Sequence, residues 1–169
     1  MSIYFTADNH YCHKNIIKYE SRPFNSVEEM NETLIDNWNR KVKSKDEIYI
    51  LGDFIFSNGL IANQLIKRLN GKKYLIKGNH DSFLKYKEFD TSLLEWVKDY
   101  CVIKQNKLPI ILFHYPIARF DRQHYGAIHL YGHVHSRPND LNITNAYNVG
   151  VDVNGYEPIS LEEVLGKLK

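Results

Sequence analysis

The sequence predicts an α/β fold with mixed strand directions, and three observations support this prediction. Short apolar runs rich in isoleucine, tyrosine and phenylalanine are typical of buried strands, and they cover residues 3–5, 48–51, 74–76, 110–113 and 128–131. Segments with helical periodicity lie between several of these runs. The 169 residues suffice for one sizeable core, so we expect a single domain over 1–169.

The predicted helices have recognisable start signals. Ser26 with Glu29 has the spacing of a capping box and precedes an apolar stripe that predicts a helix. Ser160 with Glu163 repeats the signal and predicts a final helix that continues to about residue 168. A third helix is predicted over 60–69, where an Asn-Gly pair follows as its stop.

Two further segments extend the predicted sheets. Residues 97–113 have the pattern of a hairpin with its turn near Asn106 and Lys107. Residues 141–157 indicate additional strands. Hairpin pairing together with strand–helix alternation is what predicts mixed strand directions.

Composition and charge argue against several classes of partner. The net charge is +2 and the lysines are scattered, so charge alone predicts no attraction to nucleic acid or membrane. Cys12 and Cys101 form no CxxC pattern and are expected to be reduced thiols. The chain begins without a basic signal-peptide region and contains no apolar run of membrane-spanning length. We therefore expect a cytoplasmic protein with no membrane partner.

Each predicted strand runs directly into polar residues that can bind metal. They are Asp8 and His10, Asp53, Asn79 with His80 and Asp81, His114, and His133 with His135. Ligands gather at the carboxyl ends of strands in α/β sheets, so these residues are expected to form one site. Residues two apart in an extended segment point to the same side, so His133 and His135 can reach that site together.

The residue types in this set indicate a particular kind of metal chemistry. Carboxylates, imidazoles and one amide, with no thiolate, suit manganese, iron or zinc rather than a cysteine-type structural zinc site. Seven side chains are more than one ion needs, and they suit two ions that share a bridging carboxylate: Asp8, His10, Asp53, Asn79, His114, His133 and His135.

The order of these residues resembles the calcineurin-like metallophosphoesterase superfamily, in its short single-domain bacterial branch. Five blocks match the family pattern in order: Asp8-Asn9-His10, Gly52-Asp53, Gly78-Asn79-His80-Asp81, His114 and Gly132-His133-Val134-His135. The resemblance implies a four-layer α/β/β/α sandwich of two mixed sheets. It also implies hydrolysis of phosphate esters, in which a metal-bound hydroxide attacks phosphorus.

The resemblance further implies a role for each residue of the site. The implied ligands of the first ion are Asp8, His10 and His135, those of the second are Asn79, His114 and His133, and Asp53 bridges the two. On this basis His80 is the catalytic histidine near the leaving group, and Asp81 orients it. The ions are expected to be two divalent metals, with manganese favoured over iron or zinc.

Three other residues are candidates for contact with substrate. His13 follows His10 by three positions and is expected to contact phosphate, to support the ligands from outside, or to be a surface histidine. Arg119 and Arg122 follow His114, and arginine forks suit phosphate oxygens, although a solvated loop explains each of them as well.

Several alternatives for the function remain open at this stage. The sequence leaves little room for a cap over the site, which slightly favours a phosphodiester substrate. A phosphomonoester such as a nucleotide is the alternative, and nucleic acid is a further candidate substrate. A non-catalytic interaction scaffold of the same fold belongs to a different class, and the oligomeric state is not predicted.

Overall fold

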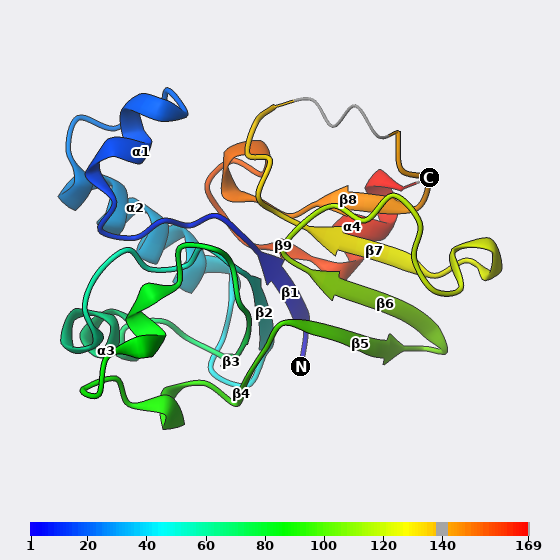
Figure 1. Cartoon of the computed structure of the whole chain (residues 1–169), viewed down its shortest axis with the longest axis horizontal. Coiled ribbons are helices and arrows are strands. Elements are labelled where there is room, and N and C mark those ends of the chain that lie inside the picture. Colours follow the sequence, from blue (N-terminus) through cyan, green and yellow to red (C-terminus); the bar gives the residue numbers. More distant parts are fainter. Residues whose placement is uncertain (138–141, 169) are drawn as a thin grey trace.

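The computed structural model describes residues 1–137 and 142–168, which form two mixed β-sheets flanked by helices (Figure 1). The first sheet has the order β4-β3-β2-β1-β9 and comprises β1 (Ile3–Thr6), β2 (Glu47–Leu51), β3 (Lys72–Ile76), β4 (Trp96–Lys98) and β9 (Ile159–Ser160). The second has the order β5-β6-β7-β8 and comprises β5 (Tyr100–Gln105), β6 (Leu108–Phe113), β7 (Ile128–Tyr131) and β8 (Ala146–Asn148). The predicted α/β class with two mixed sheets is confirmed.

The strand directions bring the carboxyl ends of both sheets to one place. Strands β1 to β4 are parallel, and β9 is antiparallel to β1. In the second sheet β6, β7 and β8 are parallel, while β5 is antiparallel to β6. Just beyond β1, Ala7 N–H donates to Val149 O and Ala7 O accepts from Val151 N–H, which ties the two sheets together. The loops that leave these strands therefore share one edge.

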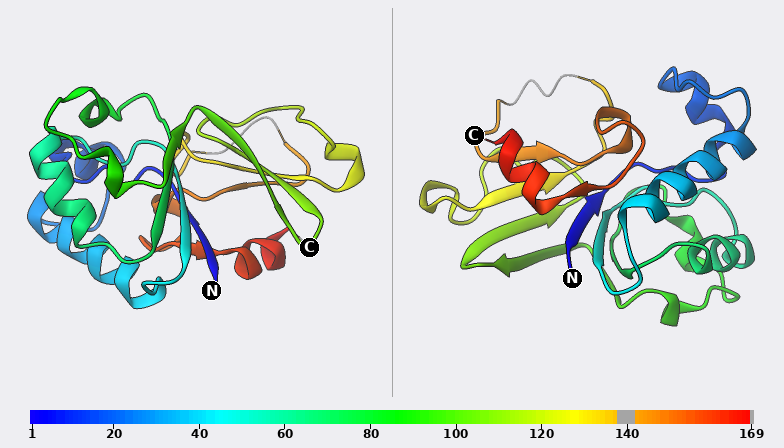
Figure 2. Two further views of the ribbon diagram at one scale, coloured as in Figure 1. Left: turned by 90° about the horizontal axis from the view of Figure 1, so that it is seen from below. Right: turned by 180° about the vertical axis from the view of Figure 1, so that it is seen from behind.

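Helices cover the first sheet on the side away from the second. They are α1 (Lys14–Tyr19), α2 (Val27–Lys41) and α3 (Gly59–Lys67), and a fourth helix, α4 (Leu161–Lys167), contacts β9 and β1 (Figure 2). Short 3₁₀ helices lie in the connections: η1 (Ser82–Lys85), η2 (Thr91–Leu93), η3 (Gln123–Tyr125) and η4 (Val151–Val153). No helix in the described part of the chain is long and apolar enough to cross a bilayer.

Two apolar clusters hold these layers together. Trp38 of α2 and Ile66 of α3 pack with Ile50 of β2 on the helical side of the first sheet. Leu51 of β2 and Leu130 of β7 belong to the cluster between the sheets, which Val164 of α4 also joins. Burial of such side chains is the main favourable contribution to folding. The sheets therefore form a stable base for the loops at their shared edge.

The outer face of the second sheet is covered by residues 115–127. The ring of His129, which is buried in β7, accepts a hydrogen bond at Nε2 from Ile117 N–H at 3.1 Å, and Phe120 packs on it at 5.4 Å between ring centroids. This segment therefore has a structural task in covering the sheet.

Some details differ from the sequence prediction. Ser26 Oγ accepts from Glu29 N–H at 3.0 Å, but the Glu29 carboxylate accepts from Asn25 N–H, so the expected capping box is only half formed. The box of Ser160 and Glu163 is complete.

The predicted hairpin is shorter than expected. Residues 96–98 form β4 and pair with β3 in the first sheet, and the hairpin consists of β5 and β6 alone. Of the segment 141–157, residue 141 lies outside the described residues, and only β8 is a strand.

Candidate metal centre

The seven predicted ligands converge where the strands of both sheets end. Six form two groups, and the ligand atoms within each group lie within 4.8 Å of one another: Asp8, His10 and His135, and Asp53, His114 and His133. Asn79, the seventh, joins the second group because its Oδ1 lies 3.1 Å from His114 Nε2.

Asp53 lies between the two groups. Its Oδ2 is 3.5 Å from His10 Nε2 and 3.6 Å from His114 Nε2. The other carboxylate oxygen, Oδ1, accepts a hydrogen bond from His80 N–H at 2.8 Å, which fixes the side chain in this orientation. One oxygen of Asp53 therefore faces both ligand groups at once.

The backbone at the ligands has an unusual conformation. Asp8, His10, Asp53, His133 and His135 have φ angles of 55°, 49°, 52°, 71° and 50°, in the left-handed region that non-glycine residues rarely adopt. Hydrogen bonds between neighbouring loops hold these conformations, including Asp8 N–H to Gly52 O at 3.0 Å and His10 N–H to Asp53 O at 3.0 Å. Strain of this kind is typical of functional sites, where the surrounding structure compensates for it.

Two glycines leave the space that the carboxylates occupy. A Cβ atom at Gly78 would collide with Oδ1 and the backbone nitrogen of Asp53, and one at Gly132 would lie 2.8 Å from Asp8 Oδ2. Any side chain at these positions would displace a ligand. The glycines before Asn79 and His133 therefore serve close packing of the site.

In two of the histidines, a hydrogen bond at one ring nitrogen determines which nitrogen is free to bind a metal. His114 Nδ1 lies 2.7 Å from Leu51 O, and His135 Nδ1 lies 2.7 Å from Asp152 Oδ2. A carbonyl or carboxylate oxygen only accepts, so each Nδ1 carries the proton and each Nε2 keeps its lone pair for a metal.

A buried cluster behind the first group was not found from the sequence. The guanidinium of Arg22 donates to both oxygens of Asp152, at 2.8 and 2.9 Å, and to the carbonyl oxygens of Asp8 and Asn9 at 2.7 and 2.9 Å. Asp152 in turn accepts from His135. Arg22 and Asp152 thus connect the loop of Asp8 to the ring of His135.

Burial and neighbouring charges shift the pKa values at the site. Burial raises the pKa of the Asp8 carboxyl to about 6 and lowers the pKa of His10 to about 3. Burial alone would also raise the pKa of the Asp53 carboxyl. The hydrogen bond and charge of His114, the backbone hydrogen bond from His80 and the charge of His10 outweigh this effect, and the pKa of Asp53 falls to about 2. At the His10–Asp53 contact these shifts favour a neutral imidazole beside a charged carboxylate, the protonation states that metal ligands need.

One buried atom of the site makes no hydrogen bond to any of the described residues. His10 Nε2 is buried and makes no hydrogen bond, although buried polar atoms are almost always paired. A cation coordinated there would satisfy this nitrogen. The residues present therefore fit a metal in the first group.

Comparison with known proteins agrees with this geometry. A family model described as calcineurin-like phosphoesterase matches residues 1–111. The chain belongs to this family. An uncharacterized protein of Methanocaldococcus jannaschii, MJ1445, is 38% identical over 170 residues, which cover 96% of this chain and 89% of that protein. The crystal structure of AQ665 from Aquifex aeolicus, a protein of unknown function, has a TM-score of 0.74 and 27% identity, with 99% of each chain covered.

His114, His133 and His135 lie beyond the residues matched by the calcineurin-like phosphoesterase model. The fold nevertheless brings all three to the ligands that lie within the matched segment. The candidate ligands thus come from both the matched and the unmatched parts of the chain.

The structure places His80 beside the ligands, with its ring exposed to a cavity. The ring centroid lies 5.6 Å from that of His10 and 6.1 Å from that of Phe56. Asp81 has a different task from the one implied by the family resemblance. Its carboxylate accepts from the backbone N–H groups of Asp53, Phe54 and Gly78, at 3.1, 2.7 and 2.7 Å. Asp81 thus holds the two loops of Asp53 and Asn79 together, and none of its hydrogen bonds among the described residues reaches the His80 ring.

Of the three candidate substrate contacts, the structure brings only His13 to the ligands. His13 Nδ1 lies 3.2 Å from His10 Nδ1, and the ring stacks on Phe56. Arg119 lines a separate cavity with Gln123 and His124. Arg122 is exposed and lies 3.6 Å from Asp121, which adjoins it in sequence. Neither arginine lines a cavity beside the ligand groups.

A cavity opens beside each ligand group. The first, of about 730 Å³, is lined by His10, His80 and His135 and extends toward α1. The second, of about 580 Å³, is lined by Asn79, Lys77 and Tyr115 among others. The ligand groups are therefore approached from two sides.

Proposed function

We propose that the protein is a metal-dependent phosphoesterase that uses two divalent ions and acts preferentially on phosphodiesters. The observation that carries this proposal is the position of Asp53 Oδ2, at 3.5 and 3.6 Å from imidazole nitrogens of the two ligand groups. A carboxylate oxygen shared by two groups is the arrangement used by two-metal sites in phosphoryl transfer. Membership of the calcineurin-like phosphoesterase family supports the same reaction class.

The ligand chemistry supports manganese as the resident metal, with iron and zinc as alternatives. The two groups offer imidazole nitrogens and carboxylate oxygens, and Asn79 adds an amide oxygen. When bound, two such ions polarise the phosphoryl oxygens and lower the pKa of the water that attacks phosphorus.

The protein's own residues position the reacting groups and supply a proton. The rings of His114 and His135 are held by Leu51 O and Asp152, so their free nitrogens need no reorientation. His80, whose backbone N–H is held by Asp53 and whose ring lines the first cavity, donates a proton to the departing oxygen.

The preference for diesters rests on the two cavities. A diester has a substituent on each side of phosphorus, and a cavity lies beside each ligand group. A tight grip on a dianionic monoester would need unpaired cations at the phosphate, yet Arg119 and Arg122 lie elsewhere. Lys77 and Arg137, which line the two cavities, are already paired with Asp99 and Glu20. Both observations favour the diester.

Hydrolysis of matched aryl esters tests this proposal. With Mn²⁺ we expect turnover of bis(4-nitrophenyl) phosphate, a lower kcat/KM for 4-nitrophenyl phosphate, and loss of both activities with a chelator. A higher kcat/KM for the monoester would reverse the substrate preference. Full metal loading without turnover of either ester would instead indicate a non-catalytic scaffold.

Replacement of His80 by alanine is expected to affect poor leaving groups most. General acid catalysis is typically worth about 10²- to 10⁴-fold, and an alkoxide needs the donated proton far more than a nitrophenolate does. The measurement is kcat over a series of esters of graded leaving-group pKa. The exposed His124 of η3 provides a matched control, and His124→Ala should leave the series unchanged. Equal losses across the series for His80→Ala would contradict a proton-donor role.

A further inference from the structure

The cavity beside the first ligand group is much larger than a phosphate group needs. Its volume is about 730 Å³, and beyond His10 and His135 it is lined by Ile16, Tyr19 and Phe56. Ile16 and Tyr19 belong to the short helix α1, and Phe56 lies in the loop after β2. The site of phosphate chemistry thus continues into an aromatic compartment.

The aromatic side chains of this compartment are exposed. Tyr19 is 66% exposed and Phe56 is 44% exposed, although neighbouring apolar residues of the same elements, such as Ile16 and Ile55, are buried. Exposed apolar surface that lines a concave site is typical of ligand binding. The two rings are therefore available to a ligand.

His13 fixes the orientation of this aromatic surface relative to the metal ligands. Its ring stacks on Phe56, with 4.3 Å between centroids and 23° between planes, and meets Tyr19 edge-on at 6.3 Å. On its other side His13 Nδ1 lies 3.2 Å from His10 Nδ1. A continuous series of contacts therefore runs from a metal ligand to the aromatic compartment.

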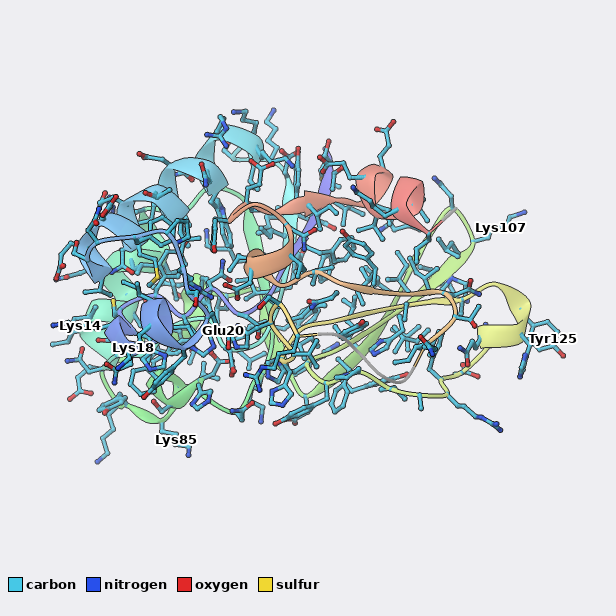
Figure 3. All side chains as sticks on the ribbon, turned by 90° about the horizontal axis from the view of Figure 1, so that it is seen from above. Lys14, Lys18, Glu20, Lys85, Lys107 and Tyr125 are labelled. Carbon is cyan, nitrogen blue, oxygen red and sulfur yellow. The ribbon has the colours of Figure 1, made fainter. Side chains whose placement is uncertain are left out.

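Polar side chains also line this compartment, among them Glu20, Ser136 and Arg137. The Glu20 side chain, only 6% exposed, accepts hydrogen bonds from Arg137 Nη2 at 3.2 Å and Ser136 Oγ at 3.4 Å. Figure 3 shows Glu20 toward the middle of the molecule, while Lys14 and Lys18 of α1 lie nearer its outer end. Hydrogen-bond donors and acceptors thus line the same cavity as the aromatic rings.

We propose that this compartment binds the planar heterocyclic base of a nucleoside phosphate ester whose phosphate lies at the metal ligands. The inference rests on the proposed function and specifies its substrate class. Phe56 and Tyr19 offer ring surfaces on which any base can stack, and Glu20 with Arg137 offers polar groups to the edge of the base. Among the described residues that line the cavity, Arg137 is the one fixed cation, so the metals are expected to supply most of the attraction to phosphate.

The test compares two ligands that differ only in the base. Dissociation constants of adenosine 5′-monophosphate and ribose 5-phosphate are measured by calorimetry on protein loaded with Mn²⁺. We expect the nucleotide to bind about tenfold more tightly, as stacking on aromatic residues predicts. In Phe56→Leu and Tyr19→Leu the ratio of the two dissociation constants should fall toward one, while the affinity for ribose 5-phosphate stays unchanged.

Tyr125→Leu is the matched control. Tyr125 is a highly exposed tyrosine on η3, remote from this cavity, and its replacement should keep the tenfold ratio. Equal affinity of the wild-type protein for the two ligands would overturn the inference, as would a ratio that survives both substitutions. Hydrolysis of bis(4-nitrophenyl) phosphate is measured in parallel. Protein that hydrolyses this ester but binds the nucleotide and ribose 5-phosphate equally well refutes only the base compartment. Protein that does not hydrolyse the ester refutes the proposed reaction.

Discussion

Replacement of Asp53 by asparagine is expected to weaken metal binding in both ligand groups at once. The amide oxygen can still accept from His80 N–H, which Asp53 Oδ1 does at 2.8 Å, so the loop should keep its conformation. The lost negative charge is the one that faces both His10 and His114. We expect the loss of metal affinity to exceed the roughly 10- to 100-fold that is typical when a residue merely supports a ligand.

Two comparison variants sharpen this prediction. His135→Ala removes a ligand from the first group only and should chiefly weaken one ion. Asp121→Asn removes an exposed carboxylate that lines neither cavity and belongs to neither ligand group, and it should leave the affinity for both ions unchanged. Metal content per chain is measured after reconstitution over a range of metal concentrations. Two ions bound at full affinity by Asp53→Asn would refute the bridging position.

Replacement of Arg22 by alanine is expected to cause a large loss of stability. The substitution leaves Asp152 buried without its cation and removes donors from the carbonyl oxygens of Asp8 and Asn9. Breaking a buried ion pair by removing one partner typically costs about 3–5 kcal/mol, which corresponds to a fall in Tm of about 10 °C for a domain of this size. Thermal and denaturant unfolding measure this loss.

An exposed ion pair provides the control for Arg22. Arg68 pairs with Glu32 on the surface, and Arg68→Ala should cost no more than about 1 kcal/mol. The double variant Arg22→Ala/Asp152→Ala should be destabilised by less than the sum of the two single variants, because each removes the partner of the other. Equal losses for Arg22→Ala and Arg68→Ala would show that the buried cluster does not support the fold.

The convergence of the candidate ligands was predictable because each one is a local feature of the sequence. Asp8, Asp53, Asn79, His114 and His133 each follow a strand whose apolar pattern identifies it, and parallel strands place their ends at one edge. Asp53 Oδ2 lies 3.5 Å and 3.6 Å from imidazole nitrogens of the two groups, and its bridging of two ions stays a prediction. The main strands and α2 were predictable for the same reason.

The residues that support the ligands were not predictable, because their contacts join distant segments. Arg22 and Asp152 are 130 positions apart, and no spacing rule connects them. A buried charge needs a partner, but the sequence alone does not say which charges are buried. The family resemblance implied that Asp81 orients His80, whereas the carboxylate of Asp81 accepts hydrogen bonds from the backbone N–H groups of Asp53, Phe54 and Gly78.

Short elements also escaped sequence interpretation. Helix α1 has six residues and β9 has two, which is less than a pattern of periodicity requires. Helix α1 contributes Tyr19 to the aromatic compartment, so the part of the site that bears on substrate choice was the part with the weakest sequence signal.

The most direct test of the two-metal centre is anomalous diffraction from crystals grown with Mn²⁺, recorded on both sides of the manganese absorption edge. The proposed function predicts two manganese peaks, one contacted by Asp8, His10 and His135 and the other by Asn79, His114 and His133, with the Asp53 carboxylate in contact with both ions. A single peak at saturating metal, or two peaks that Asp53 does not bridge, would contradict it.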